Sequence, residues 1–256
     1  MKRVKLTVAY DGTNYCGWQI QPNGITVQQV LEDCLRDLTG EKTEVMGASR
    51  TDAGVHALGN VAVFDTNMRM PGEKFSYALN QRLPEDIRIE KSREVEPDFH
   101  PRYATSKKTY EYKILNRRFP IPTQRLYTHF TYLPLDEEKM RQGAEYLVGE
   151  HDFKSFCGAG AQVKTTVRTI HSLQVLRDGE LITIRITGSG FLYNMVRIIA
   201  GCLMEIGGGA YPPEHMKEIL EARDRKAAGP TAPARGLTLV KIEYPEMNIQ
   251  KYFNEA

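Results

Sequence analysis

SRTDAGVHALGNVAVF, residues 49–64, carries the strongest signal for fold and chemistry in this chain. A polar turn with Arg50 and Asp52 lies between two short apolar segments that we expect to be strands, and His56 follows it closely. Such a turn emerges at the end of a sheet, where catalytic groups are held rigidly. A purely structural alternative remains open, because the Asp52 carboxylate can bond its own backbone and Gly54 can take a positive φ.

The composition is typical of a folded globular protein. The chain has 256 residues, of which 41% are hydrophobic and 26% charged, and this balance argues against extended disorder. A chain of this length is expected to form two domains or one large pseudo-duplicated domain. The four cysteines are far apart and form no CxxC pair, so we expect free thiols and no structural metal.

No segment has the pattern of an export signal or a membrane span. Residues 4–10 alternate between apolar and polar instead of forming an apolar block. The most apolar long stretch, 191–206, is interrupted by Asn194, Arg197 and Glu205, so it is too short and too charged to cross a bilayer. We therefore expect a cytoplasmic protein without a membrane partner.

Periodicity and turn residues predict a mixture of strands and helices in the first half. One helix is expected to begin after Thr26, which forms a capping box with Gln29, and to end at Gly40. The irregular segment 94–106 is expected to be the junction with the second half. The other predicted elements are strands at 4–10, 45–46, 60–64 and 87–89 and a helix at 74–81.

The second half is expected to repeat this mixture. Asp136 is expected to cap a helix, and Asp178-Gly179 to turn a hairpin. Further predicted elements are strands at 109–115, 170–176, 181–187 and 237–244 and helices at 192–206 and 214–225. The predicted fold class is α+β: two pseudo-related, mixed and mainly antiparallel sheet halves, 1–104 and 105–256, with helices packed on one side and a central cleft.

A cationic stripe covers residues 102–125. Its aromatic residues are interleaved with the charge, which favours contact with a polyanion over the alternative of a solvated face of scattered lysines. The stripe contains the single acid Glu111 and the basic residues Arg102, Lys107, Lys108, Lys113, Arg117, Arg118 and Arg125.

Asp52 needs a cationic partner if it is both buried and reactive. The pKa of an aspartate in water is about 3.9. Full burial can raise that value by about three to five pH units, because it disfavours the charged form. A nearby guanidinium or ammonium group would keep the carboxylate ionised.

Five blocks of the sequence resemble the tRNA pseudouridine synthase A family, in family order. RTDAGVHALGNVAVF matches the signature whose aspartate, here Asp52, is the essential catalytic residue of that family. The other blocks are YDGTNYCGWQIQP, FHPRYATSKKTYEYKI, FLYNMVRIIAGCLMEIG and APARGLTLVKIEY. The resemblance covers nearly the whole chain.

The resemblance implies conversion of uridine to pseudouridine at positions 38–40 in the anticodon stem-loop of tRNA, without a cofactor or metal. The target base leaves its stack, the C1′–N1 bond breaks, the uracil turns in place, and C5 joins C1′. Asp52 would attack C1′ as a nucleophile or remove the C2′ proton, and the sequence leaves both routes open. Relatives act as homodimers, so tRNA and a second copy of the chain are the expected partners.

The resemblance also implies roles for residues outside the signature. Tyr110, in the C-terminal half, would stack on the uracil and could be the base that removes the C5 proton. Arg197 would pair with Asp52, because it projects away from the apolar stripe of its predicted helix. Further predicted substrate-binding residues are Arg50, His56 and Leu237, and the predicted RNA-binding residues are Lys107, Lys108 and Arg102.

Two other classes of function remain as alternatives. An RNA-binding protein without catalysis would keep the fold and the cationic stripe, although the intact RTD motif argues against it. A metal-dependent hydrolase could use Asp52 and His56, but no HExxH motif or second carboxylate cluster accompanies them. Activity that resists EDTA would exclude the hydrolase.

Overall fold

The computed structural model describes residues 1–160 and 163–244. In this part of the chain, helices pack against one mixed, mainly antiparallel sheet of ten strands, so the predicted α+β class is confirmed. None of the described helices is both long and apolar enough to cross a membrane. The end of the predicted C-terminal half, residues 245–256, lies outside the described residues.

The N-terminal half consists of antiparallel strands and two helices. Val4, Leu6 and Val8 alternate with more exposed neighbours and are fully buried, as the pattern at 4–10 predicts. The strands are β1 (Lys2–Tyr10), β2 (Met46–Gly47), β3 (His56–Thr66) and β4 (Ile87–Val95), and the helices are α1 (Val27–Thr39) and α2 (Phe75–Asn80).

Helix α1 begins and ends where the sequence predicts. The Thr26 hydroxyl accepts a hydrogen bond from the Gln29 N–H at 3.4 Å. At the other end, Gly40 adopts φ 73°, and its N–H donates to the Arg36 carbonyl. The apolar stripe of the helix is thereby fixed over the core.

The C-terminal half supplies the remaining strands and helices. Asp136 caps α3 by accepting hydrogen bonds from Glu138 N–H at 3.0 Å and Lys139 N–H at 3.1 Å, as predicted. The strands are β5 (Lys107–Asn116), β6 (His129–Thr131), β7 (Gly149–Asp152), β8 (Val167–Asp178), β9 (Leu181–Gly188) and β10 (Leu237–Glu243), and the helices are α3 (Glu137–Glu145), α4 (Met195–Gly207) and α5 (His215–Ala222). The predicted hairpin at Asp178-Gly179 joins β8 to β9.

Two helices are shorter than predicted because left-handed residues border them. Asn194 has φ 59°, so α4 begins at Met195 instead of at 192. Arg223 has φ 50°, and α5 ends before it instead of at 225. Conversely, β4 extends beyond the predicted residue 89, because it pairs with β1 along its length.

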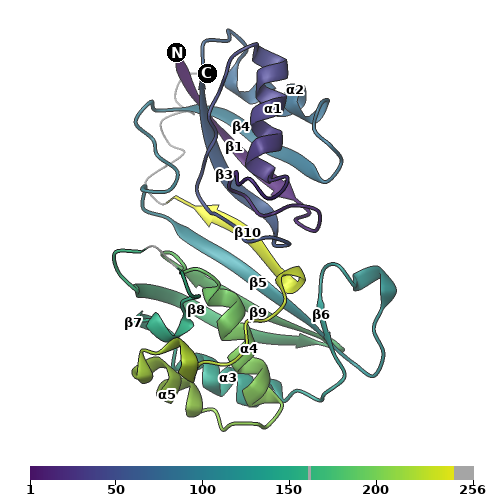
Figure 1. The fold of residues 1–256 in the computed structure, drawn as a ribbon, viewed down its shortest axis with the longest axis vertical. Coiled ribbons are helices and arrows are strands. Elements are labelled where there is room, and N and C mark those ends of the chain that lie inside the picture. The colour runs from purple at the N-terminus through teal and green to yellow at the C-terminus, as the bar shows by residue number, and fades with distance from the viewer. Residues whose placement is uncertain (161–162, 245–256) are drawn as a thin grey trace, which may run out of the picture.

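Strand β10 joins the two halves into one continuous sheet. It is antiparallel to β5 and parallel to β3, where Thr238 lies opposite His56 and Leu239 opposite Ala57. The strand order is β4-β1-β3-β10-β5-β9-β8-β7, with β2 beside β3 and β6 beside β5. Figure 1 shows α1 and α2 at one end of this sheet and α3, α4 and α5 at the other. The turn before β3 is thereby placed near β5.

Candidate active site

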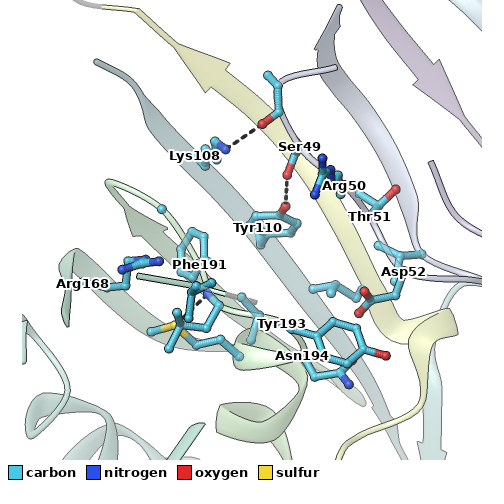
Figure 2. A pocket seen from close by; sticks show the side chains of 18 of the residues that line it. Ser49, Arg50, Thr51, Asp52, Lys108, Tyr110, Arg168, Phe191, Tyr193 and Asn194 are labelled. Carbon is cyan, nitrogen blue, oxygen red and sulfur yellow. Dashed lines mark hydrogen bonds between the residues drawn. The ribbon is translucent and has the colours of Figure 1, made fainter. Parts of the chain in front are cut away.

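A pocket of about 620 Å³ contains residues from both halves of the chain (Figure 2). The turn 48–52 contributes one wall, and the segment 189–196, which leads into α4, contributes another. The predicted site residues that line this pocket are Arg50, Asp52, Arg102, Lys108, Tyr110 and Leu237. The sheet therefore brings together residues that the sequence separates widely.

The backbone of the Asp52 turn is fixed on both sides. The Asp52 carbonyl accepts from Val55 N–H at 3.1 Å, and Gly54 takes the positive φ, 76°, that the turn requires. The Thr51 carbonyl accepts from Trp18 N–H at 3.0 Å, and Trp18 itself is buried. Within the described residues, the Asp52 carboxylate bonds no backbone group of its turn and makes one hydrogen bond, to Arg197. The structural alternative for this side chain therefore has no support.

Asp52 and Arg197 form an ion pair in the junction between the halves. One guanidinium N–H donates to the Asp52 Oδ2 across 3.5 Å, and both side chains are mostly buried. The Arg197 Nε donates to the Ala232 carbonyl at 2.7 Å, and its Nη1 also donates to the Asn194 Oδ1 at 2.9 Å. These two bonds aim the guanidinium toward Asp52. Because α4 begins only after Asn194, Arg197 lies in its first turn.

Burial raises the pKa of Asp52, and the charge and hydrogen bond of Arg197 oppose that rise. The net direction is upward, so desolvation is the larger effect. The ionised carboxylate is consequently held in an environment that solvates it less well than water does. A carboxylate of this kind is more basic than an exposed one, which suits a nucleophile or a proton acceptor.

Tyr110 is held in the pocket wall by both its ring and its hydroxyl. The hydroxyl lies 2.7 Å from the Ser49 Oγ, and the ring packs edge-on against Phe191 with centroids 5.2 Å apart. Burial raises the pKa of Tyr110 to about 12, with the Asp52 charge adding to the rise and the Ser49 hydrogen bond opposing it. The phenol is therefore protonated at neutral pH.

A buried polar network beneath the turn was not found by sequence reasoning. Asn60, fully buried in β3, donates to the Ser49 carbonyl at 3.1 Å and to the Tyr10 hydroxyl at 3.3 Å. The Tyr10 hydroxyl lies 2.7 Å from the Thr51 Oγ1. The network connects the turn to β1 and β3 from below, and an asparagine inside an apolar strand pattern was the only sequence signal for it.

His56 is buried outside the pocket lining. Its Nδ1 lies 3.1 Å from the Gly12 nitrogen and 3.1 Å from the Asp11 Oδ1, and its Nε2 lies 2.9 Å from the Leu126 carbonyl oxygen. Its ring also contacts that of Tyr127. Both ring nitrogens are thus used to connect the start of β3 with neighbouring loops, and the structure does not bring His56 together with the other predicted site residues.

The predicted RNA-binding residues divide between two environments. Lys108 donates to the Ala48 carbonyl and Arg102 to the Gly47 carbonyl, each at 3.0 Å, and both line the pocket. Lys107 is exposed and does not line it. Arg168, at the start of β8, lines the pocket although nothing in the sequence pattern singled it out. Because successive side chains of a strand point to opposite faces, the spacing of two residues in β5 could have predicted that Lys108 and Tyr110 share a face.

Comparison with known proteins shows the family to which the sequence is similar. The sequence model of the tRNA pseudouridine synthase family matches residues 6–104 and 144–245. The tRNA pseudouridine synthase A of Acetivibrio thermocellus is 51% identical over 244 residues, which cover 95% of this chain and 100% of that relative. The enzyme of the same name from Thermoanaerobacter sp. strain X514 is 48% identical over 244 residues, with the same coverage. A solved Cbf5-Nop10-Gar1 complex matches with 14% identity and a TM-score of 0.36 over 78% of this chain and 45% of that chain, too slight a likeness to carry an argument.

These matches show that the protein is of the class of uridine isomerases that act on tRNA. Nearly the whole described chain is aligned, in both halves. The chain belongs to the tRNA pseudouridine synthase family.

Proposed function

We propose that this chain isomerises uridine to pseudouridine at positions 38–40 in the anticodon stem-loop of tRNA, with Asp52 as the catalytic carboxylate and no cofactor. The observation that carries this proposal is the mostly buried Asp52–Arg197 pair, whose aspartate lines a pocket that contains residues from both halves. The pocket is large enough for a nucleoside turned out of its stack. The resemblance of the signature motif supports the positions on tRNA.

The reaction is an isomerisation, so the chain must supply only placement and proton transfer. Asp52 either bonds to C1′ as the C1′–N1 bond breaks, or removes the C2′ proton to leave a glycal. In both routes the ionised carboxylate acts first, and Arg197 keeps it ionised against the effect of burial. The uracil then turns and C5 bonds to C1′, while the Asp52–C1′ bond breaks in the first route or the proton returns to C2′ in the second. C5 finally loses its proton to a base, and N1 gains one.

Tyr110 is assigned to stacking on the uracil. Its pKa of about 12 leaves the phenol protonated in the free enzyme, which disfavours the alternative role as the base for the C5 proton. Its ring, fixed by Phe191 and Ser49, is a rigid platform for a base. Leu237, at the start of β10, adds an apolar wall to the same pocket.

RNA contact is assigned to the cations of the pocket and to the exposed Lys107. Arg50, Arg102 and Lys108 line the pocket on the side of the N-terminal turn. Phosphate neutralisation by such residues gives sequence-independent affinity that weakens with salt. A homodimer that holds one tRNA against both subunits is part of the proposal and comes from the family resemblance.

The metal-dependent hydrolase has less support. His56, its second expected ligand, uses both ring nitrogens for hydrogen bonds. Among the residues that the structure describes, no three His, Cys, Asp or Glu side chains are grouped as metal ligands.

Pseudouridine mapping with a carbodiimide on unmodified tRNA tests the proposed function directly. The purified protein is incubated with the tRNA in the presence of EDTA and without added cofactor. We expect new alkali-resistant carbodiimide adducts at uridines 38–40. Adducts at other tRNA positions would overturn the proposed site, and formation of pseudouridine that stopped in EDTA would contradict a reaction without a metal.

A further inference from the structure

Four cationic side chains line the same pocket without an acidic partner. They are Arg50, Arg102, Lys108 and Arg168, which we call the cationic cluster. Across residues 1–160 and 163–244, no carboxylate lies within ion-pair distance of any of the four. The one acid of the pocket lining, Asp52, is paired with Arg197 instead.

The Tyr110 ring lies between Lys108 of the cationic cluster and the reacting carboxylate of Asp52. Lys108 and Tyr110 are two residues apart in β5, on one face of the sheet and about 7 Å apart along the strand. Figure 2 shows Tyr110 between Lys108 and Asp52, with Arg168 on the side of β8 and Arg50 on the side of the turn. A group bound at the cluster would therefore lie roughly one backbone step from a base placed on Tyr110.

The arrangement is electrostatically costly when the pocket is empty. Burial, together with the smaller effect of the nearby charges of Arg102 and Arg168, lowers the pKa of Lys108 to about 8. Burial also lowers the pKa of Arg102, with the charge of Arg50 contributing. Partly buried like charges are normally compensated by a counter-charge. An anionic occupant would supply one.

The donors of the cluster suit a phosphate group. Lys108 uses one of its three N–H donors on the Ala48 carbonyl, and Arg102 uses its Nη2 on the Gly47 carbonyl. These two bonds fix each cationic head while leaving further N–H groups on it. Arginine and lysine together provide a planar fork and a point charge, the combination that binds phosphate oxygens.

We propose that the cationic cluster is a subsite for one backbone phosphodiester of the substrate RNA, next to the uridine that is turned into the pocket. This inference rests on the proposed function, because it places the substrate base on Tyr110. Phosphodiesters are the charged groups of RNA, so an anion that reaches the cluster while the base lies beside Asp52 must be a backbone phosphate. The subsite positions the nucleotide and takes no part in bond making.

A neutral phosphate replacement in the RNA tests the subsite on the unmodified protein. Anticodon stem-loops are made with one methylphosphonate, placed in turn at each linkage flanking the target uridine, and KM and kcat are measured for each. At the linkage that the cluster binds, we expect KM to rise about 10-fold, with a smaller change in kcat. Equal KM values for all the methylphosphonates would overturn the proposal.

Two variants and a matched control locate the effect on the cluster. Lys108→Met and Arg168→Met should each raise KM for the normal RNA about 10-fold, and should add little for the methylphosphonate RNA that lacks the bound charge. Lys108→Arg should restore most of the affinity. Lys91→Met, which removes an exposed lysine of β4, should change KM neither for the normal RNA nor for the methylphosphonate RNA. If the increases in KM caused by the variant and by the methylphosphonate were fully additive, the side chain and that phosphate would not be in contact.

A calorimetric titration with inorganic phosphate separates an RNA subsite from a site for the free anion. We expect weak binding of inorganic phosphate, because it lacks the base contacts that accompany the backbone. Tight phosphate binding together with indifference to methylphosphonates would replace the RNA subsite by a free-anion site. If the wild-type protein formed no pseudouridine at all, the proposed function would fail; if it formed pseudouridine and KM ignored the cluster, only the subsite would fail.

Discussion

The Asp52 carboxylate and the Arg197 guanidinium, 145 residues apart in the sequence, approach to 3.5 Å where the two halves of the sheet meet. The pair exists because β10 crosses from one half to the other and fixes β3 and β5 as neighbours of the same strand. Reactivity of the carboxylate is thereby tied to the correct assembly of both halves.

Removing the guanidinium should impair catalysis most at low pH. In Arg197→Met the buried Asp52 loses the charge that opposes desolvation, so the pKa of its carboxyl rises further above the ordinary value. We expect kcat to fall about 10-fold or more at neutral pH and to recover partly as the pH is raised. The measurement is kcat between pH 5 and pH 9, with the exposed Arg36→Met as the control. An acid limb that coincides with that of the wild type would contradict the role of Arg197.

Neutralising Asp52 should stabilise the fold while it removes activity. The pKa of Asp52 is higher in the folded than in the unfolded chain, so its contribution to stability is present below the unfolded pKa and is lost as the pH rises. Asp52→Asn should therefore have a higher Tm than the wild type at neutral pH, and the difference should vanish near pH 3. Thermal unfolding at both pH values checks this. A lower Tm at neutral pH would show that the ion pair outweighs desolvation.

Binding of RNA should weaken as Lys108 loses its proton. Its pKa of about 8 means that the side chain is charged below this pH and neutral above it. The facing groups are Arg50, Arg102 and Arg168, which stay charged, together with Tyr110 and the Arg197-paired Asp52. We expect the Kd for an anticodon stem-loop to rise between pH 7 and pH 9 in the wild type. Lys108→Arg should flatten this dependence, and an equally steep rise in that variant would point to another group.

The Tyr110 ring should contribute to affinity independently of its hydroxyl. Stacking of a base on an aromatic ring is worth about 1–3 kcal/mol. Tyr110→Ala should therefore raise the Kd for a substrate stem-loop by about 5- to 150-fold. Tyr110→Phe keeps the ring and its contact with Phe191, so its Kd should remain close to that of the wild type. Equal losses in both variants would contradict the stacking role.

The buried network should hold the turn in place. Asn60→Ala leaves the Ser49 carbonyl without its side-chain donor and the Tyr10 hydroxyl with Thr51 alone, at a cost of about 1–3 kcal/mol in the free energy of unfolding. Urea unfolding of this variant should show that loss, and the exposed Asn67→Ala should not. A stability equal to that of the wild type would mean that water or neighbouring groups satisfy the network.

Local patterns were enough to predict most elements of the fold. The alternation in β1, the caps at Thr26 and Asp136 and the hairpin at Asp178 depend on residues within a few positions of each other. The predicted start of α4 was too early and the predicted end of α5 was too late. Asn194 and Arg223 adopt left-handed conformations at these two boundaries, and the helical periodicity does not reveal them. The single sheet depends on the distant pairing of β10, which no local pattern encodes.

The residues of the candidate site were predictable to the extent that a motif carried them. Asp52, Tyr110 and Arg197 lie in quoted blocks, and the structure brings them to one junction. Arg168 and Asn60 contribute through long-range packing, which a single sequence does not display. His56 shares the signature motif, yet the structure places it against Gly12, Leu126 and Tyr127, outside the pocket lining, because membership of a motif does not fix the direction of a side chain.

Single-turnover formation of pseudouridine by Asp52→Asn, with enzyme in excess over unmodified tRNA, tests the central claim most directly. The matched control is Asp33→Asn on the exposed face of α1. Removal of the carboxylate should leave tRNA binding close to that of the wild type and abolish pseudouridine, while the control converts tRNA at the wild-type rate. Near-normal conversion by Asp52→Asn would contradict the assignment of Asp52 as the catalytic carboxylate.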